Sequence, residues 1–151
     1  MTLDEIDSGI RNLKAIGGRN NIFTTNGITV IDDCYNANPM SMKASINVLS
    51  QANGRKVAIL GDMFELGENS KELHKEVGQA AGKVDILVCI GNLSKDIAEA
   101  AIEGGCNTLY FPNKADFEEN LSAYIKEGDT VLIKASNGMK FSEIVNVLKE
   151  R

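Results

Sequence analysis

The sequence changes character twice between Gly27 and Ser45, which read G-I-T-V-I-D-D-C-Y-N-A-N-P-M-S-M-K-A-S. The β-branched residues near its start are typical of a buried strand, and Pro39 with the residues after it is typical of the first turn of a helix. The loop between them, D-D-C-Y-N-A-N at 32–38, carries more polar chemistry than a turn requires. In an open parallel sheet, ligands bind beyond the carboxyl ends of the strands. We therefore expect this loop to be the centre of a binding site.

The composition is that of an ordinary globular domain. The chain has 151 residues, of which 43% are hydrophobic and 25% charged, with a formal net charge of -5. This length suits one domain, and the acidic balance counts against a general affinity for nucleic acid. No apolar run approaches the roughly 20 residues that cross a bilayer, and no secretion signal is visible. We expect a cytoplasmic protein without a membrane partner.

The cysteines do not indicate a disulfide framework. Cys34, Cys89 and Cys106 are odd in number, widely spaced and without a C-x-x-C motif. This pattern also argues against a structural zinc site. We expect all three to be reduced and buried, and we assign no metal ligand to this domain.

Strands and helices alternate along the chain. We expect a first helix over residues 3–14, and then a hairpin of two strands, 21–25 and 28–32, joined by Asn26-Gly27. The remaining strands are expected at 56–60, 86–90, 108–111 and 130–134, and the remaining helices at 39–51, 70–81, 94–103, 115–126 and 140–149. The alternation predicts an α/β, Rossmann-like three-layer domain whose sheet is mainly parallel with one antiparallel edge strand.

Polar loops follow three of the predicted parallel strands, at 32–38, 61–68 and 134–138. Because the carboxyl ends of parallel strands share an edge, we expect these loops to meet. Asp33 could accept hydrogen bonds from a ribose or hold a magnesium-bound water, and Tyr35 could stack on a base or peptide. Lys134 could pair with a carboxylate or phosphate, and Ser136 could hold an anion.

Each of these residues also has a purely structural interpretation. Asp33 could cap a turn, and Tyr35 could be a packing aromatic. Asn38 before Pro39 is often a helix cap, and a lysine at a strand end, such as Lys134, is usually a solvated charge. An ordinary structural or solvated role is equally open to Asp62, Glu65, Arg19 and His74, the last of which we expect to face solvent beside an inward-facing Leu73.

Several common catalytic motifs are missing from the sequence. The first predicted parallel strand is not followed by G-x-G-x-x-G, and G-x-x-x-x-G-K-[ST] does not occur. There is also no nucleophile elbow with a Ser, His and Asp order, which makes a hydrolase a poor interpretation. If the domain takes part in nucleotide chemistry, we expect another domain to supply the phosphate-binding machinery.

The loops together resemble a known family. The motifs D-D-C-Y-N-A-N-P-x-S-M at 32–42, L-G-D-M-x-E-L-G at 60–67, His74 and I-K-A-S-N-G-M at 133–139 are similar to those of the C-terminal domain of the Mur ligases. G-G-R at 17–19 extends the resemblance to nearly the whole chain. Within that family, the chain is most similar to the member that adds D-alanyl-D-alanine to UDP-N-acetylmuramoyl-tripeptide.

The resemblance implies a reaction that is divided among domains. Mur ligases have an N-terminal domain for the UDP-sugar, a central domain with the ATP phosphate loop and a C-terminal domain that closes over the site. Residues 1–151 would be the third domain alone, with the N-terminal and central ATPase domains absent. ATP, with Mg²⁺ bound mainly by the central domain, would activate the tripeptide carboxylate as an acyl phosphate, which the amine of D-alanyl-D-alanine attacks. The isolated domain would be an inactive monomer with no catalytic residue of its own.

The same resemblance implies contacts for individual residues. The expected ATP contacts are Arg19, Asp33 and Asn36. The expected contacts on the substrate side are Tyr35, Asn38, Lys134, Ser136 and Asn137. The last loop reads K-A-S-N where family members usually read K-G-S-R. An asparagine cannot offer the bidentate fork of an arginine, so Asn137 puts the dipeptide contact in question.

Two other functions remain open at this stage. The C-terminal domain of a folylpolyglutamate synthase-like ligase has the same fold and also serves an ATP-dependent addition of an amino acid, although the Y-N-A-N-P loop argues against it. A non-catalytic nucleotide-binding module that regulates a partner is the alternative from another functional class.

Overall fold

The computed structural model describes residues 21–33 and 37–150. It contains a six-stranded sheet in the order β1-β2-β6-β3-β4-β5. The strands are β1 (Asn21–Thr25), β2 (Ile28–Asp33), β3 (Lys56–Gly61), β4 (Ile86–Ile90), β5 (Thr108–Phe111) and β6 (Thr130–Lys134). The β1–β2 pair is antiparallel and all the other pairs are parallel, which confirms the predicted fold class. The helix expected over residues 3–14 lies outside the described residues.

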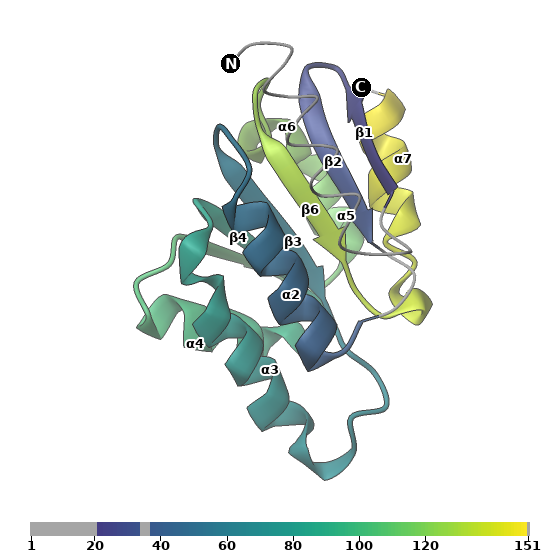
Figure 1. The fold of residues 1–151 in the computed structure, drawn as a ribbon. Helices are drawn as coiled ribbons and strands as arrows, with labels where there is room; N and C mark the ends of the chain where they lie inside the picture. Colours follow the sequence, from purple (N-terminus) through teal and green to yellow (C-terminus); the bar gives the residue numbers. More distant parts are fainter. Residues whose placement is uncertain (1–20, 34–36, 151) are drawn as a thin grey trace.

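Helices cover both faces of the sheet, as Figure 1 shows. The helices α2 (Pro39–Ser50), α3 (Ser70–Ala80) and α4 (Ser94–Glu103) lie on one face. On the other face lie α5 (Lys114–Glu119), α6 (Leu121–Tyr124) and α7 (Ser142–Glu150). Three short 3-10 turns, η1 (Gly67–Asn69), η2 (Ala81–Lys83) and η3 (Asn137–Met139), join or extend these elements.

The two faces carry two separate hydrophobic cores, because alternate residues of each strand point to opposite sides. In β3, Ala58 and Leu60 belong to the core under α2, α3 and α4, whereas Val57 and Ile59 belong to the core under α5, α6 and α7. A strand that is buried on both faces has to be apolar throughout. The continuous apolar run that predicted β3 therefore follows from its place in the middle of the sheet.

The hairpin at the edge of the sheet has the predicted turn. Asn26 and Gly27 both have positive φ angles, 51° and 80°. Two successive positive φ angles match the right-handed twist of the flanking strands, and asparagine and glycine tolerate them best. The turn sets the register in which Thr25 pairs with Ile28.

Two predicted helices differ from the structure. The helix expected over 115–126 is interrupted at Asn120, whose side-chain amide donates to the carbonyl of Asp116 at 3.1 Å. Such local bonds from asparagine compete with the helix. The helix expected over 140–149 begins only at Ser142, because Lys140 adopts a left-handed conformation with φ of 56°.

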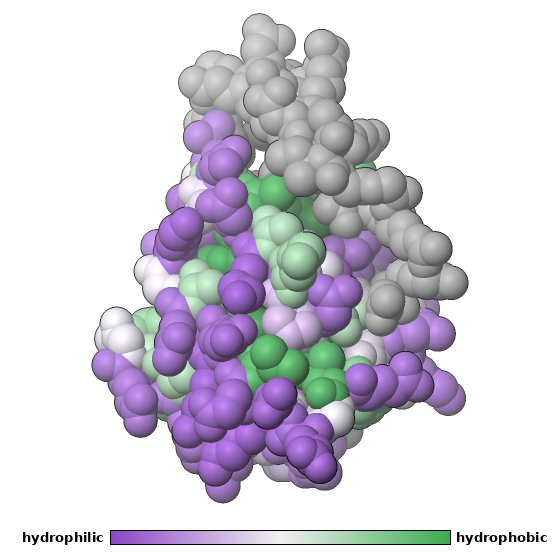
Figure 2. All heavy atoms as spheres, turned by 60° about the horizontal axis from the view of Figure 1, so that its bottom comes forward, coloured by the Kyte–Doolittle hydropathy of each residue, from purple (hydrophilic) through white to green (hydrophobic). Residues whose placement is uncertain are grey.

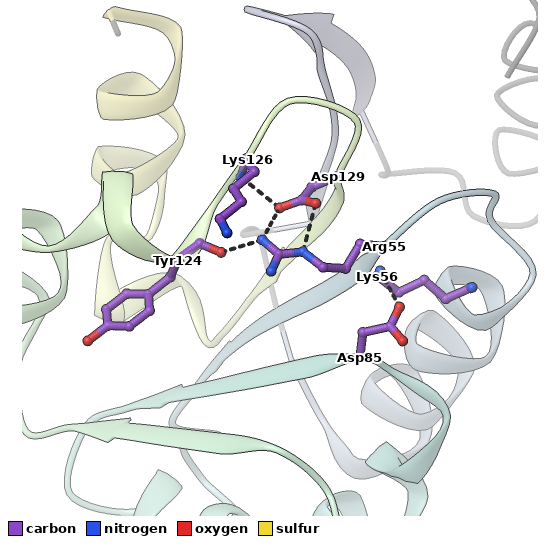
Figure 3. A network of polar contacts seen from close by, with 6 residues as sticks. All are labelled: Arg55, Lys56, Asp85, Tyr124, Lys126 and Asp129. Carbon is purple, nitrogen blue, oxygen red and sulfur yellow. Dashed lines mark hydrogen bonds and ion pairs between the residues drawn. The ribbon is translucent and has the colours of Figure 1, made fainter.

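An ion pair ties together the amino end of the sheet (Figure 3). Arg55 precedes β3, and its Nε and Nη2 donate to the two carboxylate oxygens of Asp129 at 2.9 and 2.6 Å. Arg55 also donates to the carbonyl of Tyr124, and the Lys126 amide donates to Asp129. The Asp129 hydrogen bonds raise the pKa of Arg55 above its usual value. This bidentate pair fixes the turn before β6 against the start of β3.

Candidate functional site

Two of the predicted polar loops are bonded to each other at the carboxyl edge of the sheet. The backbone amide of Ser136, after β6, donates to the carbonyl of Asp62, after β3, at 3.0 Å. The Ser136 hydroxyl accepts from the amide of Phe64 at 2.8 Å. Because β6 pairs with β2 on one side and β3 on the other, the end of β2 lies at the same edge. The expectation that the loops would meet is confirmed for those after β3 and β6, whereas residues 34–36 of the loop after β2 lie outside the described residues.

A buried ion pair joins the ends of β2 and β6. The Lys134 ammonium lies 2.6 Å from Oδ2 of Asp33, and the Ser45 hydroxyl of α2 donates to the same oxygen at 2.9 Å. Asp33 and Lys134 are register partners in the parallel pair, which places their side chains on the same face. The interpretation of Lys134 as a solvated charge is wrong, since the residue is buried and its ammonium is bonded to the Asp33 carboxylate.

Asp62 stabilises the start of α4 from outside that helix. Its Oδ1 accepts from both the amide and the hydroxyl of Ser94, each at 2.7 Å. A carboxylate at a helix N-terminus satisfies free amides and complements the helix dipole. Gly91 has a φ of 118°, and a side chain there would collide with the Asp62 carboxylate. Asp62 is thus a buried structural residue rather than an ordinary loop carboxylate.

His74 is buried, contrary to the expectation that it would face solvent. Its Nε2 accepts from the backbone amide of Met63 at 3.0 Å. Nδ1 therefore carries the proton and donates to the carbonyl of Ser70 at 2.7 Å. The expected inward-facing residue, Leu73, is only partly buried. His74 thus supplies the acceptor for a backbone amide that lies just beyond the end of β3.

Asn38 is the N-cap of α2, as its structural interpretation predicted. Its side-chain oxygen accepts from the amide of Ser41 at 2.8 Å, and the Ser41 hydroxyl accepts from the amide of Asn38 at 3.0 Å. This reciprocal capping box fixes the point at which the chain enters the helix. The cap holds the end of the 32–38 loop at the carboxyl edge.

The structure brings some of the predicted contact residues together and does not describe others. Asp33, Lys134 and Ser136 lie at one edge and are buried, while Asn38 and Asn137 are exposed there. The remaining predicted contacts, Arg19, Tyr35 and Asn36, lie outside the described residues. All the ligand roles stay predictions. The supporting residues that sequence reasoning did not assign to the site are Ser45, Ser94 and His74, and the only signal for Ser45 was its place on the inner face of α2.

Exposed hydrophobic side chains also lie at this edge. Figure 2 views the molecule from this end and shows hydrophobic side chains near the middle, surrounded by hydrophilic ones. Phe64, in the loop after β3, is 41% exposed, and Met40, in the first turn of α2, is also exposed. Single exposed hydrophobic residues are common, but an aromatic held on a fixed loop at a sheet's carboxyl edge is well placed for a ligand.

Two kinds of feature are absent from the described part of the chain. Across residues 21–33 and 37–150, the structure has no helix of sufficient length and apolarity to cross a bilayer. In the same part of the chain, no three His, Cys, Asp or Glu side chains come together in a way that could hold a metal ion.

The fold and the edge loops define a Rossmann-like α/β domain. The chain belongs to the family described as Mur ligase, glutamate ligase domain, which it matches over residues 18–137. This family is the one that the sequence motifs indicated.

Individual relatives agree with this assignment. The chain is 36% identical to the UDP-N-acetylmuramoyl-tripeptide–D-alanyl-D-alanine ligase of Bacillus subtilis, in a match that covers 97% of this chain and 34% of the relative. The identity to the Escherichia coli ligase of the same name is also 36%, covering 99% of this chain and 33% of the relative. The chain therefore spans about a third of the length of these relatives.

Solved structures show the same relationship. A crystal structure of MurF from Acinetobacter baumannii superimposes with a TM-score of 0.80 at 30% identity, covering 89% of this chain and 31% of that chain. The MurF ligase from Thermotoga maritima, crystallised in complex with ADP, gives a TM-score of 0.75 at 28% identity, with the same coverage of 89% and 31%. Both matches cover only one part of a longer ligase.

Proposed function

We propose that this chain is the C-terminal lobe of an ATP-dependent ligase that joins D-alanyl-D-alanine to UDP-N-acetylmuramoyl-tripeptide in peptidoglycan synthesis. The observation that carries the proposal is the 36% identity to ligases of that name over nearly the whole of this chain. The N-terminal and central domains would lie in the rest of the protein. The proposal places the reaction in the cytoplasm, as the composition predicts.

The chemistry would be divided between the lobes. ATP activates the carboxylate of the tripeptide as an acyl phosphate, and the amine of the dipeptide displaces phosphate to form the amide. This chain has no glycine-rich phosphate loop of its own, so the central domain would bind most of the triphosphate and Mg²⁺. The C-terminal lobe would hold the amine against the activated carboxylate and exclude water, which otherwise hydrolyses the acyl phosphate.

The described residues are better suited to positioning the reactants than to binding the phosphates of ATP directly. Asp33, the described member of the predicted ATP contacts, is almost fully buried and binds Lys134 and Ser45. A carboxylate held in this way fixes the ends of β2 and β6 relative to each other. We propose that Arg19 and Asn36 complete the nucleotide contact, and that Tyr35, Asn38, Ser136 and Asn137 border the dipeptide.

The proposal is tested with the complete protein that carries residues 1–151. The protein is incubated with ATP, Mg²⁺, UDP-N-acetylmuramoyl-tripeptide and D-alanyl-D-alanine, and the amide product is detected by mass spectrometry. We expect product and stoichiometric ADP from the complete protein, and neither from residues 1–151 alone. Product from the isolated domain would refute the division of labour, and its absence from the complete protein would refute the ligase assignment. Calorimetry of the isolated domain with ATP then tests the regulatory-module alternative.

A further inference from the structure

We propose that Phe64 is a specificity-determining residue, whose ring forms an apolar wall against the side-chain methyl groups of the incoming dipeptide. The inference rests on the proposed function and adds a residue that the family motifs leave variable, since Phe64 occupies the unspecified position in L-G-D-M-x-E-L-G. Four features of the structure support it: the position of the loop, its fixed backbone, the contact of the ring with Gly138 and the chemistry around it.

The loop after β3 occupies the middle of the carboxyl edge. In the sheet order, β3 lies between β6 and β4, so the loop at 61–66 lies between the loops that follow those two strands. One of these neighbours, at 134–138, is the predicted substrate-facing segment. A side chain that projects from the middle loop therefore borders any ligand that this segment binds.

Hydrogen bonds from three other elements hold this loop in place. Ser94 of α4 binds the Asp62 carboxylate, His74 of α3 accepts from the Met63 amide, and Ser136 after β6 accepts from the Phe64 amide. Three consecutive residues are thus each fixed to a different element. Such support is typical of loops that present a side chain in a defined position.

The exposed part of this segment is the ring that follows the fixed residues. Asp62 and Met63 are buried, whereas Phe64 is 41% exposed. Its ring lies against Gly138, where an added Cβ would be only 3.1 Å from Cε2 of Phe64. Gly138 directly follows Asn137, so the ring lies close to the backbone of the predicted substrate-facing segment. An aromatic that is held in place loses little entropy when a ligand packs on it.

The chemistry around the ring suits a small dipeptide with methyl side chains. Three charged groups at this edge, on Asp33, Lys134 and Asp62, are engaged in buried contacts. A methyl group on the ring gains apolar contact, while the Asn137 amide can donate a hydrogen bond to a peptide oxygen or carboxylate. This pairing favours D-alanyl residues over glycyl residues.

The test compares D-alanyl-D-alanine with glycylglycine in the complete protein. Phe64→Ala should lower the ratio of the kcat/KM for D-alanyl-D-alanine to the kcat/KM for glycylglycine. We expect a roughly tenfold decrease, the usual effect of losing one small apolar contact. We expect the change mainly in the KM for D-alanyl-D-alanine, with the KM for ATP unchanged. Phe64→Leu keeps much of the apolar surface and should lower the ratio only about threefold.

Ile102→Ala is the matched control. Ile102 is 57% exposed near the end of α4, which starts at the carboxyl edge and runs away from it. This variant should leave the ratio unchanged. If Phe64→Ala lowers kcat/KM equally for both dipeptides, the ring serves contact with another domain and the inference is wrong. If the wild-type protein joins neither dipeptide, the proposed function fails and this inference fails with it.

Discussion

Replacing Lys134 with methionine should destabilise the domain strongly, because it leaves the Asp33 carboxylate buried without its ammonium partner. The two charged groups are 2.6 Å apart, and their side chains are only 3% and 9% exposed. Removing one partner of a buried pair typically costs about 3–5 kcal/mol in the free energy of unfolding. In a domain of this size each kcal/mol lowers Tm by roughly 2–4 °C, so we expect Tm to fall by roughly 10 °C.

The assay is urea denaturation and calorimetry of the purified 151-residue chain, arranged as a double-mutant cycle. Lys134→Met and Asp33→Asn are measured singly and together. The double variant removes both charges, so it should cost less than the sum of the two single variants, by a coupling energy of about 2 kcal/mol. Lys43→Met is the control, because Lys43 pairs with Glu76 at 3.4 Å where both side chains are about half exposed. Its cost should be below about 0.5 kcal/mol.

Two results would refute this reasoning. If Lys134→Met costs no more than Lys43→Met, the buried pair does not hold the edge together. If the two single variants are additive, Lys134 and Asp33 act independently despite their short distance. Either result would show that the pair of Lys134 and Asp33 does not anchor the carboxyl edge.

Three further predictions concern the scaffold. Arg55→Met breaks the bidentate pair with buried Asp129 and should cost about 2 kcal/mol in urea denaturation. Gly78→Ala should also cost about 2 kcal/mol by the same measurement, although alanine favours helices, because its methyl would collide with the backbone of α4. In iodoacetamide labelling followed by peptide mass spectrometry, Cys106 should react before Cys89. Burial raises the pKa of both thiols, Cys89 the more, so Cys106 labelling should continue to increase with pH above the usual thiol range.

The fold could be predicted from the sequence because its signals are local. The bounds of β4, α4, β5 and β6 agree with the expected ones, since each strand is an apolar run between breakers. The interruption at Asn120 was missed because a side-chain bond to the backbone competes with a helical pattern that otherwise continues. The late start of α7 was missed because a lysine rarely adopts the left-handed conformation that Lys140 has.

The site was harder to predict because the same residue types serve ligands and the interior. Sequence patterns placed the polar loops at one edge, but they could not show that His74 turns inward to bind the amide of Met63. They also could not show that Lys134 has a carboxylate partner 101 positions away in the chain. Such pairings depend on which strands are neighbours, and no local pattern contains that information.

Depth separates two kinds of residue at the carboxyl edge. Asp33, Lys134 and Ser136 are buried and bound to other parts of the protein, whereas Asn137 and Phe64 are exposed. A ligand that reaches this edge therefore meets the exposed side chains first, and the buried ones determine where those side chains lie. Substitution of Asp33, Lys134 or Ser136 should change stability and binding together, because the loops lose the contacts that fix their positions. Substitution of Asn137 or Phe64 should change binding while the Tm stays within about 2 °C of the wild type.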